Sequence, residues 1–124
     1  RLLGYCLYKR MEVCPEYHTA IISITKKELK TFNFAPGDTE GFVNYPLSIK
    51  GIRFSAIFVE NDKHVKISLR SKGNFATNKF AEKHFNGGGH KNASGGNSYE
   101  SLEKSLQKFR DLLPQYKTEL DNGL

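Results

Sequence analysis

The sequence predicts a single α/β domain in which a small mixed β-sheet is flanked by helices, and three observations support this fold class. The 124 residues suffice for one hydrophobic core but not for two. Two neighbouring runs rich in Ile, Val and Phe, over residues 52–60 and 64–71, are separated by a short polar turn and indicate a β-hairpin. Residues 98–116 predict an amphipathic helix, because apolar side chains recur there on one helical face: Leu102, Leu106, Phe109 and Leu113.

The first 25 residues are expected to form one helix and one buried strand. Apolar residues recur four apart over residues 1–11, which favours a helix that Pro15 ends. The apolar run within residues 17–25 predicts a buried strand.

Three further helices are expected between this strand and the final helix. Thr25 followed by Glu28 matches a capping box, so a short helix should run to about residue 34. A second helix should start at Asp38 or Thr39 and end near residue 51, disturbed by Pro46. Helical spacing returns over residues 74–85, and a glycine-rich loop is expected over residues 86–97.

The composition excludes several classes of protein. Hydrophobic residues make up 38% and charged residues 26%, with a mean hydropathy of −0.54, as in soluble globular domains. No apolar run approaches the roughly 18 residues of a membrane span, and no secretion signal is present, so we expect a cytoplasmic protein with no membrane partner. Cys6 and Cys14 match neither a zinc site nor a disulfide framework, which predicts reduced thiols. The start at Arg1 within an expected helix favours a segment of a longer protein.

The positive charge is concentrated in one segment. Seven basic residues and one acidic residue lie between positions 63 and 91, and this excess equals the +6 of the whole chain. Such an asymmetry favours an anionic partner, either a phosphate or a nucleic acid. The alternative is a solvated face of lysines.

Gly87, Gly88 and Gly89 directly precede His90. Gly87 is explained as the residue that ends a helix, but three glycines in a row exceed what a helix end requires. Consecutive backbone N–H groups can form a concave anion site, so we expect a phosphate there with the His90 imidazole beside it. The alternative is a plain loop, and the Walker and dinucleotide-binding patterns do not match.

Arg70, Ser71 and Lys72 lie where the second hairpin strand should end and the next helix begin. Ligands gather at such ends in α/β folds, and a guanidinium can bind a phosphate through two parallel hydrogen bonds. The alternative is an exposed strand end with no ligand. The other histidines, His18, His64 and His84, fall on strand or helix patterns and are interpreted as structural, and the sequence predicts no catalytic residue and no metal ligand set.

The segment KISLRSKGNFATNKFAEKHFNGGGHKNASGG, over residues 66–96, resembles the C-terminal DHH-associated domain of the DHH phosphoesterases. The similarity points to the branch of nano-RNases and phosphatases of 3′-phosphoadenosine 5′-phosphate (PAP). GDTEGFVNYPLSIKGI, over residues 37–52, also fits this family, so residues 1–124 are interpreted as one DHH-associated substrate-binding domain.

The resemblance implies a mixed sheet with flanking helices that closes over a separate N-terminal catalytic domain and holds short RNA or a nucleoside bisphosphate. It implies that Arg70 and His90 contact substrate phosphate, that Ser71 and Lys72 support them, and that residues 87–89 admit the substrate against the backbone. Asn44 and Tyr45 lie in a family-like stretch, with no role assigned. Two divalent metals, usually manganese, are implied for the catalytic domain that carries the Asp-His-His triplet, and none for this chain.

Two alternatives come from different functional classes. The first is a non-catalytic module that binds single-stranded nucleic acid or tRNA, with bases stacking on Phe75 or Phe85. The second is an association domain that uses the expected helix over residues 1–11.

Overall fold

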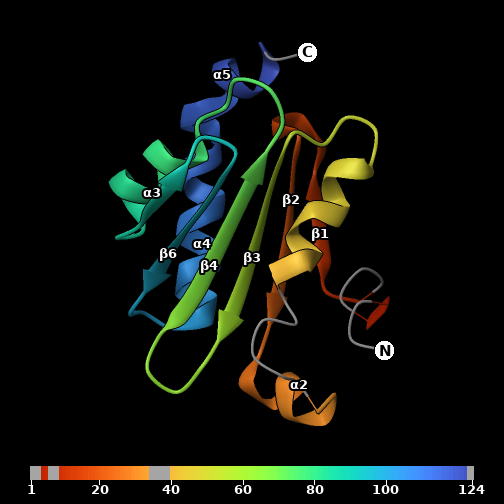
Figure 1. Cartoon of the computed structure of the whole chain (residues 1–124), viewed down its shortest axis with the longest axis vertical. Coiled ribbons are helices and arrows are strands. Elements are labelled where there is room, and N and C mark those ends of the chain that lie inside the picture. Colours follow the sequence, from red (N-terminus) through yellow and green to blue (C-terminus); the bar gives the residue numbers. More distant parts are fainter. Residues whose placement is uncertain (1–3, 6–8, 34–39, 123–124) are drawn as a thin grey trace.

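A six-stranded mixed sheet lies at the centre of the computed structural model, which describes residues 4–5, 9–33 and 40–122 (Figure 1). The strands β2 and β3 are parallel, and all other neighbouring strands are antiparallel. The predicted fold class is confirmed. The strand order is β1-β2-β3-β4-β6-β5, with β1 (Met11–Cys14), β2 (Thr19–Ile24), β3 (Phe54–Glu60), β4 (Val65–Ser71), β5 (Gly88–His90) and β6 (Ala93–Ser98).

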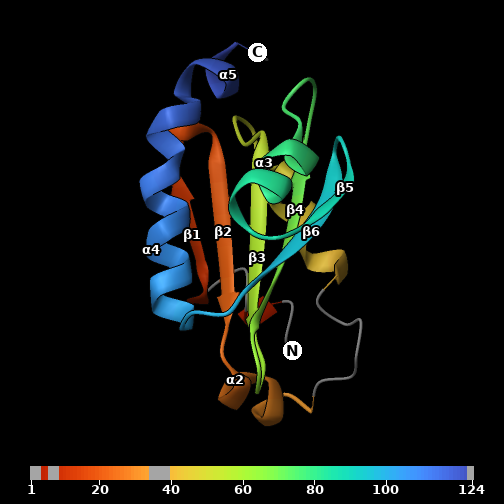
Figure 2. The same ribbon diagram turned by 90° about the vertical axis from the view of Figure 1, so that its left-hand side faces the viewer.

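Helices cover both faces of the sheet (Figure 2). The long helix α4 lies on one face, and the 3₁₀ helix η2, yellow in Figure 2, lies on the other. No helix of the described ranges is long and apolar enough to cross a membrane. The helices are η1 (Pro15–Tyr17), α2 (Lys26–Thr31), η2 (Glu40–Ser48), α3 (Thr77–His84), α4 (Leu102–Leu112), η3 (Leu113–Tyr116) and α5 (Lys117–Asp121).

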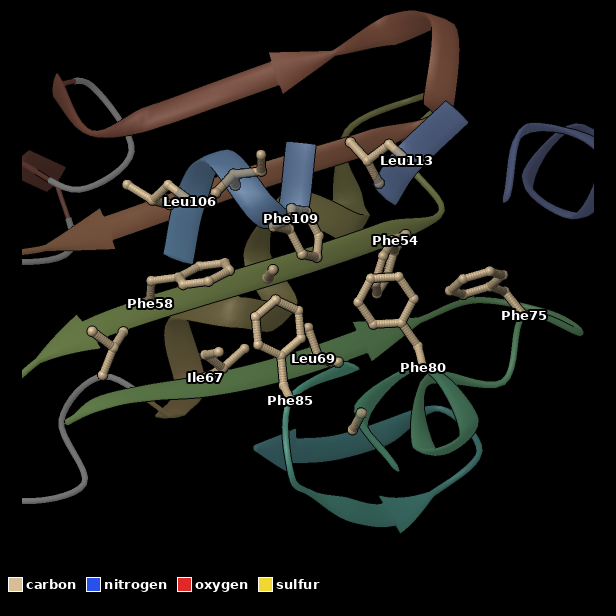
Figure 3. Close-up of a cluster of buried hydrophobic side chains, with 14 of the residues drawn as sticks. Phe54, Phe58, Ile67, Leu69, Phe75, Phe80, Phe85, Leu106, Phe109 and Leu113 are labelled. Carbon is tan, nitrogen blue, oxygen red and sulfur yellow. The ribbon is translucent and has the colours of Figure 1, made fainter. Parts of the chain in front are cut away.

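The larger core lies between the sheet and the helices α3 and α4 (Figure 3). Successive side chains of a strand point to opposite faces, so β3 sends Phe54 and Phe58 into this core and Ile57 to the other face. Ile57 joins a smaller cluster that includes Val43 of η2. Each buried Phe or Ile contributes about 1.5–3 kcal/mol relative to an exposed one.

Local sequence patterns predicted several elements correctly. The hairpin is confirmed as β3 and β4, and the buried strand as β2. The capping box is present, with Glu28 N donating to Thr25 Oγ1 at 3.1 Å and Thr25 N donating to Glu28 Oε1 at 2.8 Å. The predicted apolar face of the final helix is buried.

Two predictions in the first half of the chain are correct only in part. Met11 begins the strand β1, which pairs with β2, whereas residues 4, 5 and 9 are helical and Arg10 is in a bend. Residues 1–3 and 6–8 of the expected helix lie outside the described residues. The expected helix near Pro46 is the 3₁₀ helix η2, because proline cannot donate the backbone hydrogen bond of an α-helix interior. Its expected start at residues 38 and 39 lies outside the described ranges.

Two helix boundaries also differ. The helix expected from residue 74 begins at Thr77, after an extended Ala76 whose side chain makes no capping hydrogen bond. Ser98 belongs to β6 rather than to the final helix, and α4 is capped by Ser101, whose Oγ accepts from Lys104 N at 3.1 Å. Pro114 marks the change from α4 to η3.

Candidate nucleotide-phosphate site

Arg70 is the second-last residue of β4 and lies on the sheet face opposite α4. Its neighbours Leu69 and Ser71 point toward the core, so alternation places Arg70 on the side of η2. Its Nη1 donates to Leu69 O at 2.9 Å and contacts Ser94 O at 3.4 Å. Within the described ranges no carboxylate pairs with Arg70, so most of its donors are available to an anion.

His90 ends β5 and lies on the same face as Arg70. Both residues are in register with Ala93 of β6, Arg70 from one side and His90 from the other. Residues directly opposite in neighbouring antiparallel strands share a face, and two strand spacings separate Arg70 from His90 by about 10 Å. In this row of the sheet Ala93 is the residue between them, and its side chain is a single methyl group.

The sequence predicted a loop over the glycine-rich stretch, but this stretch forms a β-hairpin at the edge of the sheet. Gly88 pairs with Gly95, and Gly89 with Ser94, and β5 is the last strand of the sheet. An edge strand directs every second N–H away from its partner, so backbone donors remain available, although not as a nest of consecutive N–H groups.

The glycines that precede His90 have different physical reasons. Asn86, with φ of 51°, takes the left-handed position that the sequence had assigned to Gly87. Gly87 is needed for close approach instead, because a Cβ there would lie 1.9 Å from Gly95 O. At Gly88 a Cβ would meet only the Glu82 side chain, at 3.8 Å. The packing of the chain therefore does not explain Gly88.

Ser71 is a buried supporting residue rather than a group that faces a ligand. Its Oγ donates to Phe75 O at 2.7 Å and accepts from Asn92 Nδ2 at 2.8 Å. Lys72, the next residue, is exposed. These bonds tie the end of β4 to the β5–β6 turn and so fix Arg70 relative to His90.

Two positioning residues were missed by the sequence reasoning. Asn92 donates to Ser71 and also to Gly73 O at 3.1 Å, and Thr77 donates from N and from Oγ1 to Lys91 O at 2.7 and 2.9 Å. Asn92 lies in the two-residue β5–β6 turn, and asparagine is a residue type typical of turns, so the sequence could have indicated its role. No feature of the sequence indicates that Thr77 contacts this turn.

The basic segment is divided between the two ends of the sheet. Figure 1 shows the β3–β4 turn, which holds Lys63, at the end opposite the β5–β6 turn. Lys72 and Lys91 lie at the end of the sheet that carries the β5–β6 turn, next to Arg70 and His90 in the sequence. Part of the predicted positive patch therefore surrounds the candidate site.

The remaining residues that the sequence singled out have other environments. Asn44 and Tyr45 are exposed on η2, next to Val43, whose carbonyl accepts a hydrogen bond from Ser55, the residue in register with Arg70. Phe75 and Phe85 are only 4% and 1% exposed, so the stacking of bases on them is not supported.

The other histidines make hydrogen bonds within the protein. His18 lies just before β2, with Nδ1 3.0 Å from Gly51 O and Nε2 3.0 Å from Asp121 Oδ1. His84 Nε2 is 2.6 Å from the Tyr116 hydroxyl, and burial lowers the pKa of His84, helped by the nearby charge of Lys83. His64 lies just before β4, with its ring 5.9 Å from that of Tyr99. No three His, Cys, Asp or Glu residues of the described ranges are grouped as metal ligands.

Cys14 of β1 has a hydrogen-bonded thiol rather than a reactive one. Burial raises its pKa to about 11, and the neighbouring Glu12 carboxylate adds to this rise. Cys14 is free in the structure, and Cys6 lies outside the described residues.

Comparison with known proteins identifies curated relatives of this chain. It is 40% identical over 97 residues to the probable bifunctional oligoribonuclease and PAP phosphatase NrnA of Streptococcus mutans, covering 76% of this chain and 31% of that protein. It is 37% identical over 103 residues to the bifunctional oligoribonuclease and PAP phosphatase NrnA of Bacillus subtilis, covering 82% of this chain and 32% of that protein. The chain thus spans about a third of the length of these relatives.

Solved structures share the fold, and a family model matches the sequence. An exopolyphosphatase-related protein from Bacteroides fragilis superposes with a TM-score of 0.94 at 48% identity, covering 98% of this chain and 35% of that one. The pGpG-specific phosphodiesterase PggH from Vibrio cholerae, at 13% identity and a TM-score of 0.65, shares the fold over 99% of this chain and 39% of its own. Residues 16–119 match the model of the DHHA1 domain, and the chain therefore belongs to the DHHA1 domain family.

Proposed function

We propose that residues 1–124 form the substrate-binding domain of a metal-dependent phosphoesterase that acts on short oligoribonucleotides or on PAP. The observation that carries this proposal is the placement of Arg70 and His90 on one sheet face, each in register with Ala93. The names of the two NrnA relatives supply the substrate class.

Each site residue has a role in this proposal. Arg70 binds phosphate oxygens through its free N–H donors, and His90 donates a hydrogen bond to the same group. Lys72 adds long-range attraction, and Ser71 holds the end of β4 in place. Gly88 lets the substrate approach β5, whereas Gly87 and Gly89 shape the hairpin.

The hydrolytic step is assigned to a separate catalytic domain. Two divalent metals, manganese by resemblance to the family, would activate water there. In this proposal the residues of this chain bind and orient the substrate beside that domain. Holding a phosphate in fixed geometry beside the metals contributes to the rate by removing orientational freedom before reaction. The cytoplasmic location stays a prediction.

Calorimetric titration of the chain with PAP tests this function. Arg70→Ala should lower the binding free energy by about 1.5–3 kcal/mol, the range for a hydrogen bond to a charged group. Lys104→Ala, on the exposed side of α4, is the matched control and should leave affinity unchanged. Salt-independent binding, or equal effects of the two variants, would contradict the proposal.

Turnover assays separate binding from hydrolysis. The chain supplied with manganese should not hydrolyse PAP or a diribonucleotide, because the proposal assigns the metals and the hydrolytic step to a separate catalytic domain. Hydrolysis that persists through purification and responds to Arg70→Ala would show that this chain contains catalytic residues of its own.

A further inference from the structure

A groove of about 520 Å³ lies between α3 and the C-terminal helices, away from the row of Arg70 and His90. Lys79 and Lys83 of α3 line one wall, and Glu119 of α5 lies on the other. Aromatic residues, including Tyr116, line it as well. Its volume is within the range of ligand sites, which is roughly 300–1,000 Å³.

The charge of this groove favours an anion. Lys79 and Lys83 are exposed and one helical turn apart, so both ammonium groups are on the same side of α3. Neither forms an ion pair with a carboxylate of the described residues, Glu119 included. Two ammonium groups face one carboxylate, and this combination suits a phosphate.

The β5–β6 turn connects this groove to the candidate phosphate site. Asn74 lines the groove, and its Oδ1 accepts a hydrogen bond from Lys91 Nζ at 3.2 Å. Lys91 follows His90 directly, and its carbonyl oxygen accepts from Thr77 N, at the start of α3, at 2.7 Å. The β5–β6 turn, which carries Lys91, therefore lies between the Arg70–His90 row and the groove.

We propose that this groove is a second nucleotide subsite, in which Lys79 and Lys83 bind a phosphate further along an oligonucleotide. This inference rests on the proposed function and extends it. The subsite makes the domain prefer oligonucleotides to a mononucleoside bisphosphate, because PAP has a single nucleoside and no further nucleotide to place in the groove.

Binding of two probes to the 124-residue chain tests the subsite. The probes are PAP and 5′-phosphorylated pentaadenylate, titrated into the chain and into the double variant Lys79→Gln, Lys83→Gln. Pentaadenylate affinity should fall about tenfold or more, while PAP affinity stays within about twofold. The slope of log affinity against log salt for pentaadenylate should become less negative by about 1.4 if each lysine releases one phosphate contact, and by about half of that if only one does.

A matched control and an opposite charge change sharpen the test. Lys27→Gln with Lys30→Gln removes the same charge from the exposed side of α2, at the other end of the molecule, and should leave both affinities unchanged (Figure 1). Glu119→Gln removes the carboxylate of the groove and should raise pentaadenylate affinity severalfold. Circular dichroism melts of all variants verify that they fold.

The outcomes distinguish the two proposals. If the Lys79, Lys83 variant binds pentaadenylate as the unmodified chain does while Arg70→Ala weakens both probes, the subsite is wrong and the proposed function stands. Equal losses for PAP and pentaadenylate, or an equal loss in the α2 control, also overturn the subsite. If the unmodified chain binds neither probe, the proposed function fails, and the subsite fails with it.

Discussion

Arg70 and His90, 20 residues apart in the sequence, face the same side of the sheet because each is in register with Ala93. The register places the Arg70 guanidinium and the His90 imidazole on either side of Ala93. The side chain of Ala93 is a single methyl group. Larger side chains at that position would occupy the space between the two polar groups.

Ala93→Leu should therefore weaken PAP binding by about tenfold or more, because the larger isobutyl side chain would project between Arg70 and His90. Ala93 lies on a half-buried sheet face, so the domain should still fold. Asn97→Leu, on the same face of β6 but next to Lys66, is the control and should bind PAP normally. Calorimetry and thermal melts measure both effects, and unchanged binding in folded Ala93→Leu would place the phosphate elsewhere.

The neighbouring glycines Gly87 and Gly88 should respond differently to alanine. Gly87→Ala should lower the free energy of unfolding by about 1–3 kcal/mol or more, because its Cβ would overlap Gly95 O. Gly88→Ala should change it by less than about 0.5 kcal/mol, since its Cβ finds only ordinary contact. Urea unfolding of both variants checks this pair.

Gly88→Val should abolish PAP binding without unfolding the domain. Gly88 has no positive φ, so valine meets no left-handed backbone strain and the fold should persist. PAP binding should be lost, because the branched side chain would fill the space that we assign to the ligand. A folded Gly88→Val protein with normal affinity would remove Gly88 from the site.

His90→Ala should weaken PAP binding by about 1.5–3 kcal/mol, because it removes the hydrogen bond that we assign between the imidazole and the phosphate. Calorimetric titration of the variant and of the unmodified chain measures the loss. Unchanged affinity in a folded His90→Ala protein would show that His90 does not contact the phosphate.

The ion pair of Glu12 and Arg110 should make stability depend on acid. Arg110 Nε and Nη2 donate to the Glu12 carboxylate at 2.7–3.0 Å and join β1 to α4, and this hydrogen bonding lowers the pKa of Glu12 below its ordinary 4.5. A carboxyl group whose pKa is lower in the folded protein than in the unfolded chain stabilises the fold at pH values above its unfolded-state pKa. This contribution disappears as the pH falls through the folded-state pKa.

Glu12→Gln should accordingly reduce stability at pH 7, and the difference from the unmodified chain should shrink below about pH 4.5. Both side chains are more than a third exposed, so the loss should not exceed about 1 kcal/mol. Urea unfolding at pH 7 and pH 3.5 measures it. A difference that is equal at both pH values would mean that packing, not charge, is responsible.

The sequence alone determined the elements whose information is local. The hairpin of β3 and β4, the capping box at Thr25 and the buried face of α4 depend on periodicity and on contacts within a few residues. The local chemistry also singled out Arg70 and His90, because a guanidinium at a strand end and an imidazole after glycines suit phosphate whatever surrounds them.

The tertiary structure decided what depends on partners far away in the sequence. Met11 is in a strand rather than a helix because β1 pairs with the edge of β2. The glycine-rich stretch forms a hairpin because β6 pairs with β4. Register decides which side chains share a face, and a slip of one residue would send Arg70 and His90 to opposite faces. Hydrogen bonds between distant strands fix that register, and no pattern within a single segment of the sequence records them.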